Sequence, residues 1–313
     1  MKSFAFINQE SRRKPFRAGG YLPFALPTLV VAISLVIIPF GYNAYLSLFR
    51  WRGGLAPKTF IGFDNYVRLL GDEQFWISFR NSIAMIIAIV VIPTLVGVVL
   101  AAVLFDYIVR EFGGRVANSL RATVYLPQIL PIAAVGIMWS WILSAQNGAI
   151  NITLSQLGVD DLPNWLGDFP LALVSIMAVL IWGQIGFVVV IFMAALQRVD
   201  PELYEAATLD GAGWTARFRH ITIPQIKPEI YVVTLTATIY ALKVFAPILL
   251  LTKGGPEGTT YVPSYYAYYS FFSKSVVGYG AAISNVLTLL ILAVVIVILA
   301  MQTRSQRREA SGV

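Results

Sequence analysis

Long apolar runs alternate with short polar segments along almost the whole chain. About 20 consecutive apolar residues are enough for a helix to cross the hydrocarbon core of a bilayer. We predict six such helices, at residues 21–48, 79–105, 123–145, 170–196, 229–252 and 281–302. A helix satisfies its own backbone hydrogen bonds, as the bilayer interior requires. The expected fold class is therefore all-α, a polytopic membrane protein with six transmembrane helices.

The composition agrees with this interpretation. The chain has 313 residues, of which 58% are hydrophobic and 12% charged, and its mean hydropathy is +0.73. A soluble fold of this size could not bury so much apolar surface. The first apolar run is too long for a secretion signal and is followed by no small-residue cleavage site, so we expect it to be retained as a helix.

The distribution of Lys and Arg predicts an orientation, because cytoplasmic loops carry an excess of both. With the N-terminus inside, the cytoplasmic side carries Lys2, Arg12, Arg13, Lys14, Arg17, Arg110, Arg115, Arg121, Arg198, Arg217, Arg219, Lys227, Arg304, Arg307 and Arg308. The opposite side carries Arg50, Arg52, Lys58, Arg68 and Arg80 in one connector, and Lys253 and Lys274 in another. Both termini are therefore expected in the cytoplasm. We interpret the net charge of +7 as a topology signal and not as a nucleic-acid site.

A polar segment at residues 200–228 separates the fourth and fifth apolar runs. Asp200 is a good N-cap and Pro201 fits the first helical turn, so a short helix should begin there. Gly211 readily adopts the left-handed conformation that closes a helix. A second short helix is expected from Trp214 to His220, ended by the prolines that follow it.

This helix-turn-helix has the composition of a docking element. Its alanines allow another surface to approach closely, and Tyr204, Trp214 and Phe218 are aromatic anchors. An ordinary interfacial loop with amphipathic ends is the alternative interpretation.

The same segment resembles the "EAA" signature of the membrane subunits of binding-protein-dependent ABC importers. That signature reads Glu-Ala-Ala, three residues, Gly, nine residues, then Ile-x-Leu-Pro, and only Ile223 departs from it, standing where Leu is usual. The resemblance implies a loop, residues 200–224, that couples the membrane helices to an ATPase. Its candidate contact residues are Glu205, Ala206, Ala207, Asp210, Gly211, Ala212, Phe218, Ile221 and Pro224.

Other segments resemble the sugar permeases of the maltose-transporter group. They are Phe60–Tyr66, Leu126–Pro127, Leu251–Pro256 and Tyr279–Ala282. The fold implied is the type I ABC importer membrane domain. It divides the chain into a cytoplasmic N-terminal segment (1–20), a first helix with its extracytoplasmic connector (21–79), the transmembrane type-1 domain (80–302) and a cytoplasmic tail (303–313).

The resemblance also implies a division of labour in the cell membrane. This chain would form half of the translocation pathway, and a second, homologous permease subunit would form the other half. Two ATP-binding subunits would bind ATP and Mg²⁺, and an extracytoplasmic solute-binding protein would deliver a mono- or oligosaccharide or a related polyol phosphate. No cofactor is then expected in this chain.

The residues themselves argue against catalysis. The phosphate loop Gly-x4-Gly-Lys-[Ser/Thr] does not occur, so we expect ATP hydrolysis elsewhere. His220 is the sole histidine and there is no cysteine, which excludes multi-histidine and thiolate metal sites. Paired carboxylates are absent from the apolar runs. We predict no catalytic and no metal-binding residues.

Polar side chains within the apolar runs are the candidates for a solute pathway, since such groups tend to face the protein interior or a water-filled cavity. They are Lys243, Tyr240, Gln184, Asn285 and Gln128. Two other interpretations stay open: these groups hold helix to helix, or Lys243 extends to the membrane interface. A permease for amino acids, peptides or an oxyanion, and a membrane scaffold without transport, are the alternative functions.

Overall fold

The computed structural model describes residues 22–105 and 109–311, and the chain divides into two units, residues 1–45 and 46–313. In the first unit, α1 (Leu22–Ala32) continues through a π-helical turn (Ile33–Ile37) into α2 (Ile38–Leu46). Phe24–Leu46 is long and apolar enough to cross a membrane, which confirms the first predicted helix. The predicted segment 1–20 lies outside the described residues.

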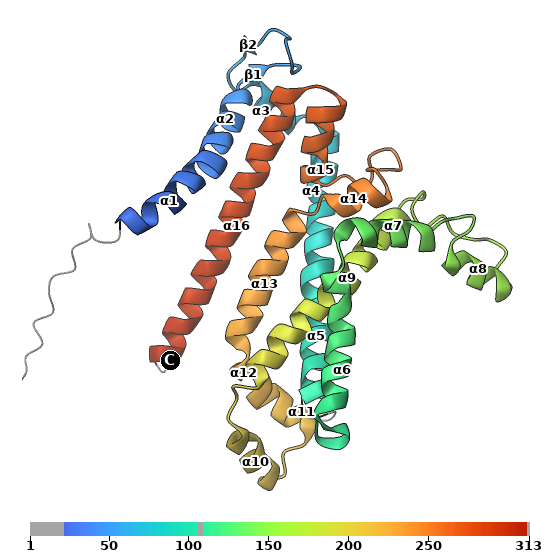
Figure 1. The fold of residues 1–313 in the computed structure, drawn as a ribbon, viewed down its shortest axis with the longest axis vertical. Helices are drawn as coiled ribbons and strands as arrows, with labels where there is room; N and C mark the ends of the chain where they lie inside the picture. Colours follow the sequence, from blue (N-terminus) through green and yellow to red (C-terminus); the bar gives the residue numbers. More distant parts are fainter. Residues whose placement is uncertain (1–21, 106–108, 312–313) are drawn as a thin grey trace, which may run out of the picture. The chain divides into compact units, whose positions relative to one another are not determined.

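The second unit is mostly helical (Figure 1). Its helices are α3 (Asp64–Leu70), α4 (Glu73–Ile86), α5 (Ile92–Val103), α6 (Val109–Ile129), α7 (Ile132–Ile142), α8 (Ala149–Gln156), α9 (Leu171–Leu196), α10 (Pro201–Leu209), α11 (Trp214–Arg217), α12 (Ile223–Gln225), α13 (Lys227–Leu242), α14 (Ala246–Leu251), α15 (Pro263–Tyr268) and α16 (Val277–Ser311). In the part of the chain that the structure describes, complete π-helical turns join α4 to α5 (Ile87–Val91) and α11 to α12 (Phe218–Thr222), and another extends α15 (Tyr269–Ser273).

A small hairpin amends the all-α prediction. Strands β1 (Phe49–Arg50) and β2 (Thr59–Phe60) pair antiparallel, with Phe49 opposite Phe60. Their rings make an edge-to-face contact with centroids 5.3 Å apart. Such an aromatic cross-strand pair helps to stabilise two strands this short.

Helix α9 is the central element of the second unit and packs against α5, α6 and α13. Half of its apolar window is buried within this chain, compared with 22% for α16. At the contact with α6, a Cβ atom added to Gly186 would lie 2.3 Å from the carbonyl oxygen of Val124. Glycine is therefore required there for the two helix backbones to approach so closely.

Among the described residues, four helices satisfy the length and composition of a membrane span: Phe24–Leu46, Glu73–Val103, Leu171–Leu196 and Val277–Arg304. These match four of the six predicted helices. The count of six is not confirmed, because the predicted third and fifth helices are each divided in two.

The predicted helix at 123–145 is broken between α6 and α7, which meet at a bend of 94°. Pro131 explains the break. A proline ring clashes with the carbonyl group four residues earlier and lacks an N–H to donate, and it disfavours helical backbone at the preceding residue. Accordingly α6 ends at Ile129, and Pro131 has an extended ψ of 132°.

The predicted helix at 229–252 is broken in the same way. Helix α13 ends at Leu242, and α14 begins only at Ala246, with Pro247 in its first turn. In a continuous helix, the ring of Pro247 would clash with the carbonyl group of Lys243. The backbone leaves the helical region at Phe245, where φ is −137° and ψ is −59°.

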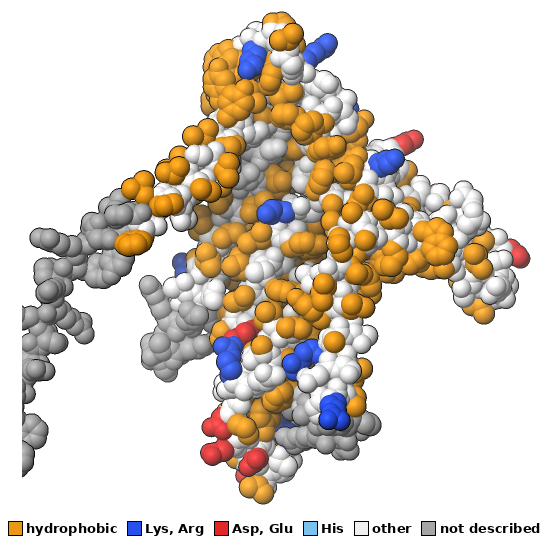
Figure 2. Space-filling model, in the orientation of Figure 1, with side chains coloured by type: hydrophobic (Ala, Val, Ile, Leu, Met, Phe, Trp, Pro, Cys, Tyr) orange, Lys and Arg blue, Asp and Glu red, His pale blue; other side chains and the backbone are white. Residues whose placement is uncertain are grey.

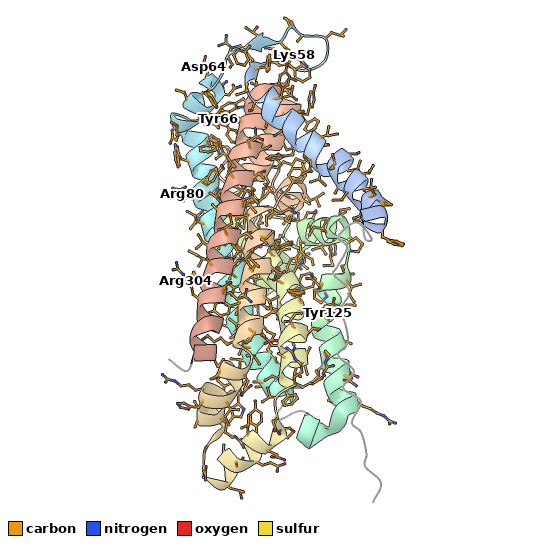
Figure 3. All side chains as sticks on the ribbon, turned by 90° about the vertical axis from the view of Figure 1, so that its left-hand side faces the viewer. Lys58, Asp64, Tyr66, Arg80, Tyr125 and Arg304 are labelled. Atoms are coloured by element: carbon orange, nitrogen blue, oxygen red, sulfur yellow. The ribbon has the colours of Figure 1, made fainter. Side chains whose placement is uncertain are left out.

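Hydrogen bonds hold together the end of the second unit that carries the hairpin. Asn81 donates to the carbonyl oxygens of Thr259 (2.6 Å) and Tyr261 (2.8 Å), which joins α4 to the loop after α14. Asn285 of α16 donates to the hydroxyl of Tyr66 on α3 at 3.1 Å. Figure 3 shows Asp64 and Tyr66 near this end and Arg304 far along α16 from them.

One carboxylate connects three elements at the same end. Asp72 Oδ1 caps α4 by accepting from the N–H groups of Gln74 (3.0 Å) and Phe75 (3.4 Å). Its Oδ2 accepts from the hydroxyls of Tyr266, at 2.6 Å, and Tyr279. These bonds fix α15 and the start of α16 to the start of α4.

Candidate functional site

The first half of the 200–224 loop folds as the sequence predicts. The Asp200 side chain accepts from the N–H of Glu202 at 3.0 Å, and Pro201 occupies the first turn of α10. Gly211 has φ +78°. The N–H of Ala212 bonds to the carbonyl oxygen of Ala207 (2.9 Å), and that of Gly211 to Thr208 (3.0 Å). This pattern is a Schellman motif, in which glycine supplies the left-handed residue that ends the helix.

The second half differs from the prediction. Helix α11 ends at Arg217, but the chain stays helical through a π-helical turn and α12 to Gln225, so Pro224 does not end the run. The wide turn before Pro224 already lacks the regular i→i−4 bonds, and proline's missing N–H therefore costs no further bond. The true break comes at Ile226, where φ is −94° and ψ is 6°.

Buried contacts hold the two halves of the loop together. The hydroxyl oxygens of Tyr204 and Thr222 lie 3.1 Å apart, and both residues are buried. Thr208 donates to the carbonyl oxygen of Tyr204 (2.7 Å) and accepts from Arg217 (2.5 Å). The loop is therefore a folded unit with its own internal bonds.

The loop is also packed against the ends of the long helices. Tyr204 belongs to an apolar cluster that includes Leu196 at the end of α9 and Val233 of α13. Arg198, which follows α9, forms an ion pair with Glu229 in the first turn of α13. A force on the loop would therefore act on α9 and α13 together.

One edge of the 200–224 loop, at Glu205–Leu209, is exposed at the surface of the second unit. The side chains of Glu205 and Leu209 are exposed, and with Tyr204 and Thr208 they line an open hollow of about 350 Å³. Several acidic side chains gather at the end of the second unit where α10 lies (Figures 1 and 2). An exposed apolar side chain beside a carboxylate and a hollow is a surface suited to a protein partner.

The structure divides the nine predicted coupling residues into two groups. Glu205, Ala206, Asp210, Gly211 and Pro224 are exposed, whereas Ala207, Ala212, Phe218 and Ile221 are partly buried. Phe218 and Ile221 pack on the apolar cluster that contains Tyr204, and Phe218 stacks on Trp214 with ring centroids 5.0 Å apart. Thr208, Leu209 and Thr222 were not predicted from the sequence, because only the fold brings them to the hollow or to Tyr204.

Two of the five predicted pathway residues line the same hollow. Gln128 of α6 and Tyr240 of α13 both line a hollow of about 150 Å³, together with Trp182 and Gly183 of α9. An amide, a phenol and an indole ring at one hollow can hydrogen-bond and stack against a solute.

The other three pathway residues lie elsewhere. Gln184 is buried in α9 without lining that hollow, and Asn285 bonds to Tyr66. Lys243 is exposed just beyond the end of α13. Among the residues that the structure describes, no three or more His, Cys, Asp or Glu side chains lie close enough to hold a metal ion.

The chain resembles known transport proteins over most of its length. It is 34% identical over 280 residues to the trehalose/maltose transport system permease protein MalF of Thermococcus litoralis, covering 90% of this chain and 92% of that protein. It is 33% identical over 281 residues to the diacetylchitobiose uptake system permease protein NgcF of Streptomyces coelicolor, covering 87% and 78%.

A solved structure has the same fold. It is a bacterial ABC transporter involved in the import of the acidic polysaccharide alginate, and one of its chains matches with a TM-score of 0.78 and 25% identity, covering 91% of this chain and 96% of that one. The sequence profile of the family described as "binding-protein-dependent transport system inner membrane component" matches residues 94–310. The chain belongs to this family of transport permeases.

Proposed function

We propose that this permease forms half of the translocation pathway of an ATP-driven importer and carries a carbohydrate delivered by a solute-binding protein. The observation that carries the proposal is the 200–224 loop. It is fixed to α9 and α13 by buried contacts and presents the edge Glu205–Leu209 outward.

In this account the chain performs no chemistry itself. ATP and Mg²⁺ are bound by two separate subunits that dock on the exposed edge of the loop. Closure of those subunits displaces the loop, and the buried contacts of Tyr204 transmit the displacement to α9 and α13. Nucleotide state thereby selects between two arrangements of the helices, one open to each side of the membrane.

The nature of the solute follows from the hollow between α6, α9 and α13. None of its lining residues is Asp, Glu, Lys or Arg, and Gln128, Tyr240 and Trp182 offer neutral hydrogen bonds and an aromatic face. These groups suit a hydroxyl-rich, uncharged solute better than an amino acid or an oxyanion. The sugar substrates in the names of the related permeases support the same class.

The membrane arrangement is part of the proposal. The pair α6–α7 and the pair α13–α14 each cross the membrane once as a bent unit, so the chain crosses it six times. Both termini and the 200–224 loop then lie in the cytoplasm. A second, homologous permease covers apolar side chains that this chain leaves exposed, such as Leu289, Leu292 and Ile296 of α16.

Uptake by the purified assembly tests the proposal. The permease is extracted with its partners, reconstituted in vesicles with the solute-binding protein, and supplied with labelled neutral sugars, amino acids and dipeptides. We expect ATP-dependent accumulation of a neutral sugar or oligosaccharide. Accumulation of an amino acid or dipeptide alone would contradict the carbohydrate assignment, and extraction without any ATPase would favour the scaffold alternative.

A further inference from the structure

The connector between the first two long helices carries a charge that topology does not explain. Its four basic residues, Arg50, Arg52, Lys58 and Arg68, lie on the side that the positive-inside rule would leave poor in Lys and Arg. Arg80, predicted from the sequence to lie in the same connector, is within α4. Basic residues on that side are the reverse of what the topology rule favours, so we expect them to have a role other than orienting the chain in the membrane.

The fold gathers three of these four around one pocket. A pocket of about 340 Å³ at the hairpin end of the second unit is lined by Arg50 of β1, by Arg52 in the loop after β1, and by Arg68 of α3. Lys58 lies on the same hairpin (Figure 3). Its amine is 4.3 Å from the centroid of the Trp51 ring. The pocket therefore lies at the opposite end of the unit from α10 (Figure 1).

The walls of the pocket are fixed before anything binds. The buried side chain of Asn65 donates to the carbonyl oxygens of Ser47 (2.7 Å) and Phe49 (3.1 Å), which ties α3 to β1. The guanidinium of Arg68 lies 4.3 Å from the centroid of the Tyr279 ring. Preformed walls lower the entropy lost when a partner binds.

The charge of the pocket is not balanced within the described part of the chain. Asp64 is the single carboxylate among the lining residues. No described carboxylate lies within ion-pairing distance of Arg50, Arg52 or Arg68. Three guanidinium groups around one hollow favour an anion, and their planar forks match the two oxygens of a carboxylate.

The surface around the pocket is typical of a protein interface. Arginine and aromatic residues are enriched at such interfaces. The connector and the start of α4 expose a set of large apolar side chains: Leu55, Phe60, Phe63, Val67, Leu70 and Trp76. Figure 2 shows basic side chains among hydrophobic ones at this end of the molecule.

We propose that this pocket receives an acidic side chain of the solute-binding protein, so that Arg50, Arg52 and Arg68 form the charged centre of its docking surface. The inference rests on the proposed function, which places the hairpin end outside the cell. It adds the residues that make the contact and the charge of the partner surface.

Stimulation of ATP hydrolysis by the solute-binding protein tests this inference. The intact transporter is reconstituted in nanodiscs and titrated with the purified, substrate-loaded binding protein. For the double variant Arg50→Glu, Arg52→Glu we expect the half-stimulating concentration to rise about tenfold or more, with unchanged ATPase activity in the absence of binding protein. Added salt should raise the same concentration for the unaltered transporter, because it screens exposed charges.

Two controls make the result specific. Lys253→Glu with Lys274→Glu makes the same change of charge in another extracytoplasmic loop without lining the pocket, and should leave the half-stimulating concentration unchanged. Arg50→Gln with Arg52→Gln introduces no new repulsion and should give a smaller increase.

The possible outcomes distinguish a failure of this inference from a failure of the proposed function. Equal half-stimulating concentrations for the double variant and the unaltered transporter would overturn the inference and leave the proposed function standing. If the double variant alters basal ATPase activity, and does so only in nanodiscs that contain phosphatidylglycerol, the pocket is assigned to a lipid headgroup. That result would also overturn the inference. Absence of stimulation in the unaltered transporter would contradict the proposed function itself.

Discussion

The hydroxyl oxygens of Tyr204 and Thr222 lie 3.1 Å apart in the interior of the 200–224 loop, with the two residues 5% and 1% exposed. The bond connects α10 to the π-helical turn that leads into α12 and α13. A displacement of α10 can therefore reach α13 through this bond as well as through the apolar cluster that contains Tyr204 and Val233. The loop is thereby joined to the membrane helices by a specific buried contact as well as by chain connectivity.

Replacing Tyr204 by Phe should loosen this connection. The change leaves the buried hydroxyl of Thr222 without its partner, which costs about 1–3 kcal/mol. We expect more ATP hydrolysed per solute imported, measured in reconstituted vesicles. Adding Thr222→Val to Tyr204→Phe removes the hydroxyl that was left without a partner. The double variant should therefore recover part of the folding stability that Tyr204→Phe loses, and a double variant no more stable than Tyr204→Phe would argue against a coupling through this bond.

Gly211→Val should uncouple transport. Nothing lies within 4 Å of a Cβ built on Gly211, so the effect comes from its φ of +78° and not from a clash. A β-branched residue in that conformation costs roughly 1–3 kcal/mol. Gly211→Asn is the matched control, because Asn tolerates the left-handed region. Normal uptake by the valine variant in an intact assembly would count against the role of this turn.

Glu205→Ala should weaken the association of the ATPase subunits while membrane insertion stays intact. Glu205 is exposed beside the hollow on α10, and loss of an interface charge of this kind costs about 1–2 kcal/mol. The measurement is the amount of ATPase that copurifies with the permease. Glu202→Ala, on the same helix but outside the lining of the hollow, should leave recovery unchanged; equal recovery for both variants would remove Glu205 from the interface.

The Asp72 carboxylate should contribute stability that disappears in acid. Burial raises the pKa of Asp72, but hydrogen bonds from Tyr266, Tyr279 and the N–H groups of α4 outweigh it, so the pKa lies below its ordinary value of 3.8. A carboxyl with a lowered pKa stabilises the folded state above the unfolded pKa and loses that contribution as pH falls through the folded pKa.

Thermal unfolding of the Asp72→Asn variant checks this expectation. Asn retains the capacity to cap α4 and removes the charge. We expect a lower midpoint than for the unaltered protein at pH 7, with the gap closing as the pH falls below about 4. A gap that stays constant or widens in acid would show that the charge of Asp72 does not stabilise the fold.

The sequence contained enough information to predict the continuous long helices and the start and turn of the 200–224 loop. Length and hydropathy alone define α9 and α16, and Asp200, Pro201 and Gly211 act locally. Pro131 and Pro247 lie at the two breaks that the hydropathy pattern did not predict. Whether a proline bends a helix or divides it depends on packing around the freed carbonyl groups, which a hydropathy pattern does not reveal.

Contacts between distant segments could not be predicted. Asp72 bonds to Tyr266 and Tyr279 across sequence separations of 194 and 207 residues, and no local pattern marks that pairing. The arginine pocket gave a partial signal, because several basic residues fall within residues 50–68, a connector predicted to be extracytoplasmic. Only the pairing of β1 with β2 and the position of α3 bring Arg50, Arg52 and Arg68 together.

The most direct test of the account uses a single cysteine in place of Leu209, whose side chain is 89% exposed beside Glu205. The chain has no cysteine of its own, so Leu209→Cys introduces one thiol. Its labelling by a membrane-impermeant maleimide is measured in intact cells and in inside-out vesicles, with and without the ATPase subunits. We expect labelling only in inside-out vesicles, and protection when the ATPase is bound. Labelling from outside the cell, or labelling that the ATPase does not diminish, would contradict the assignment of the loop as a cytoplasmic ATPase contact.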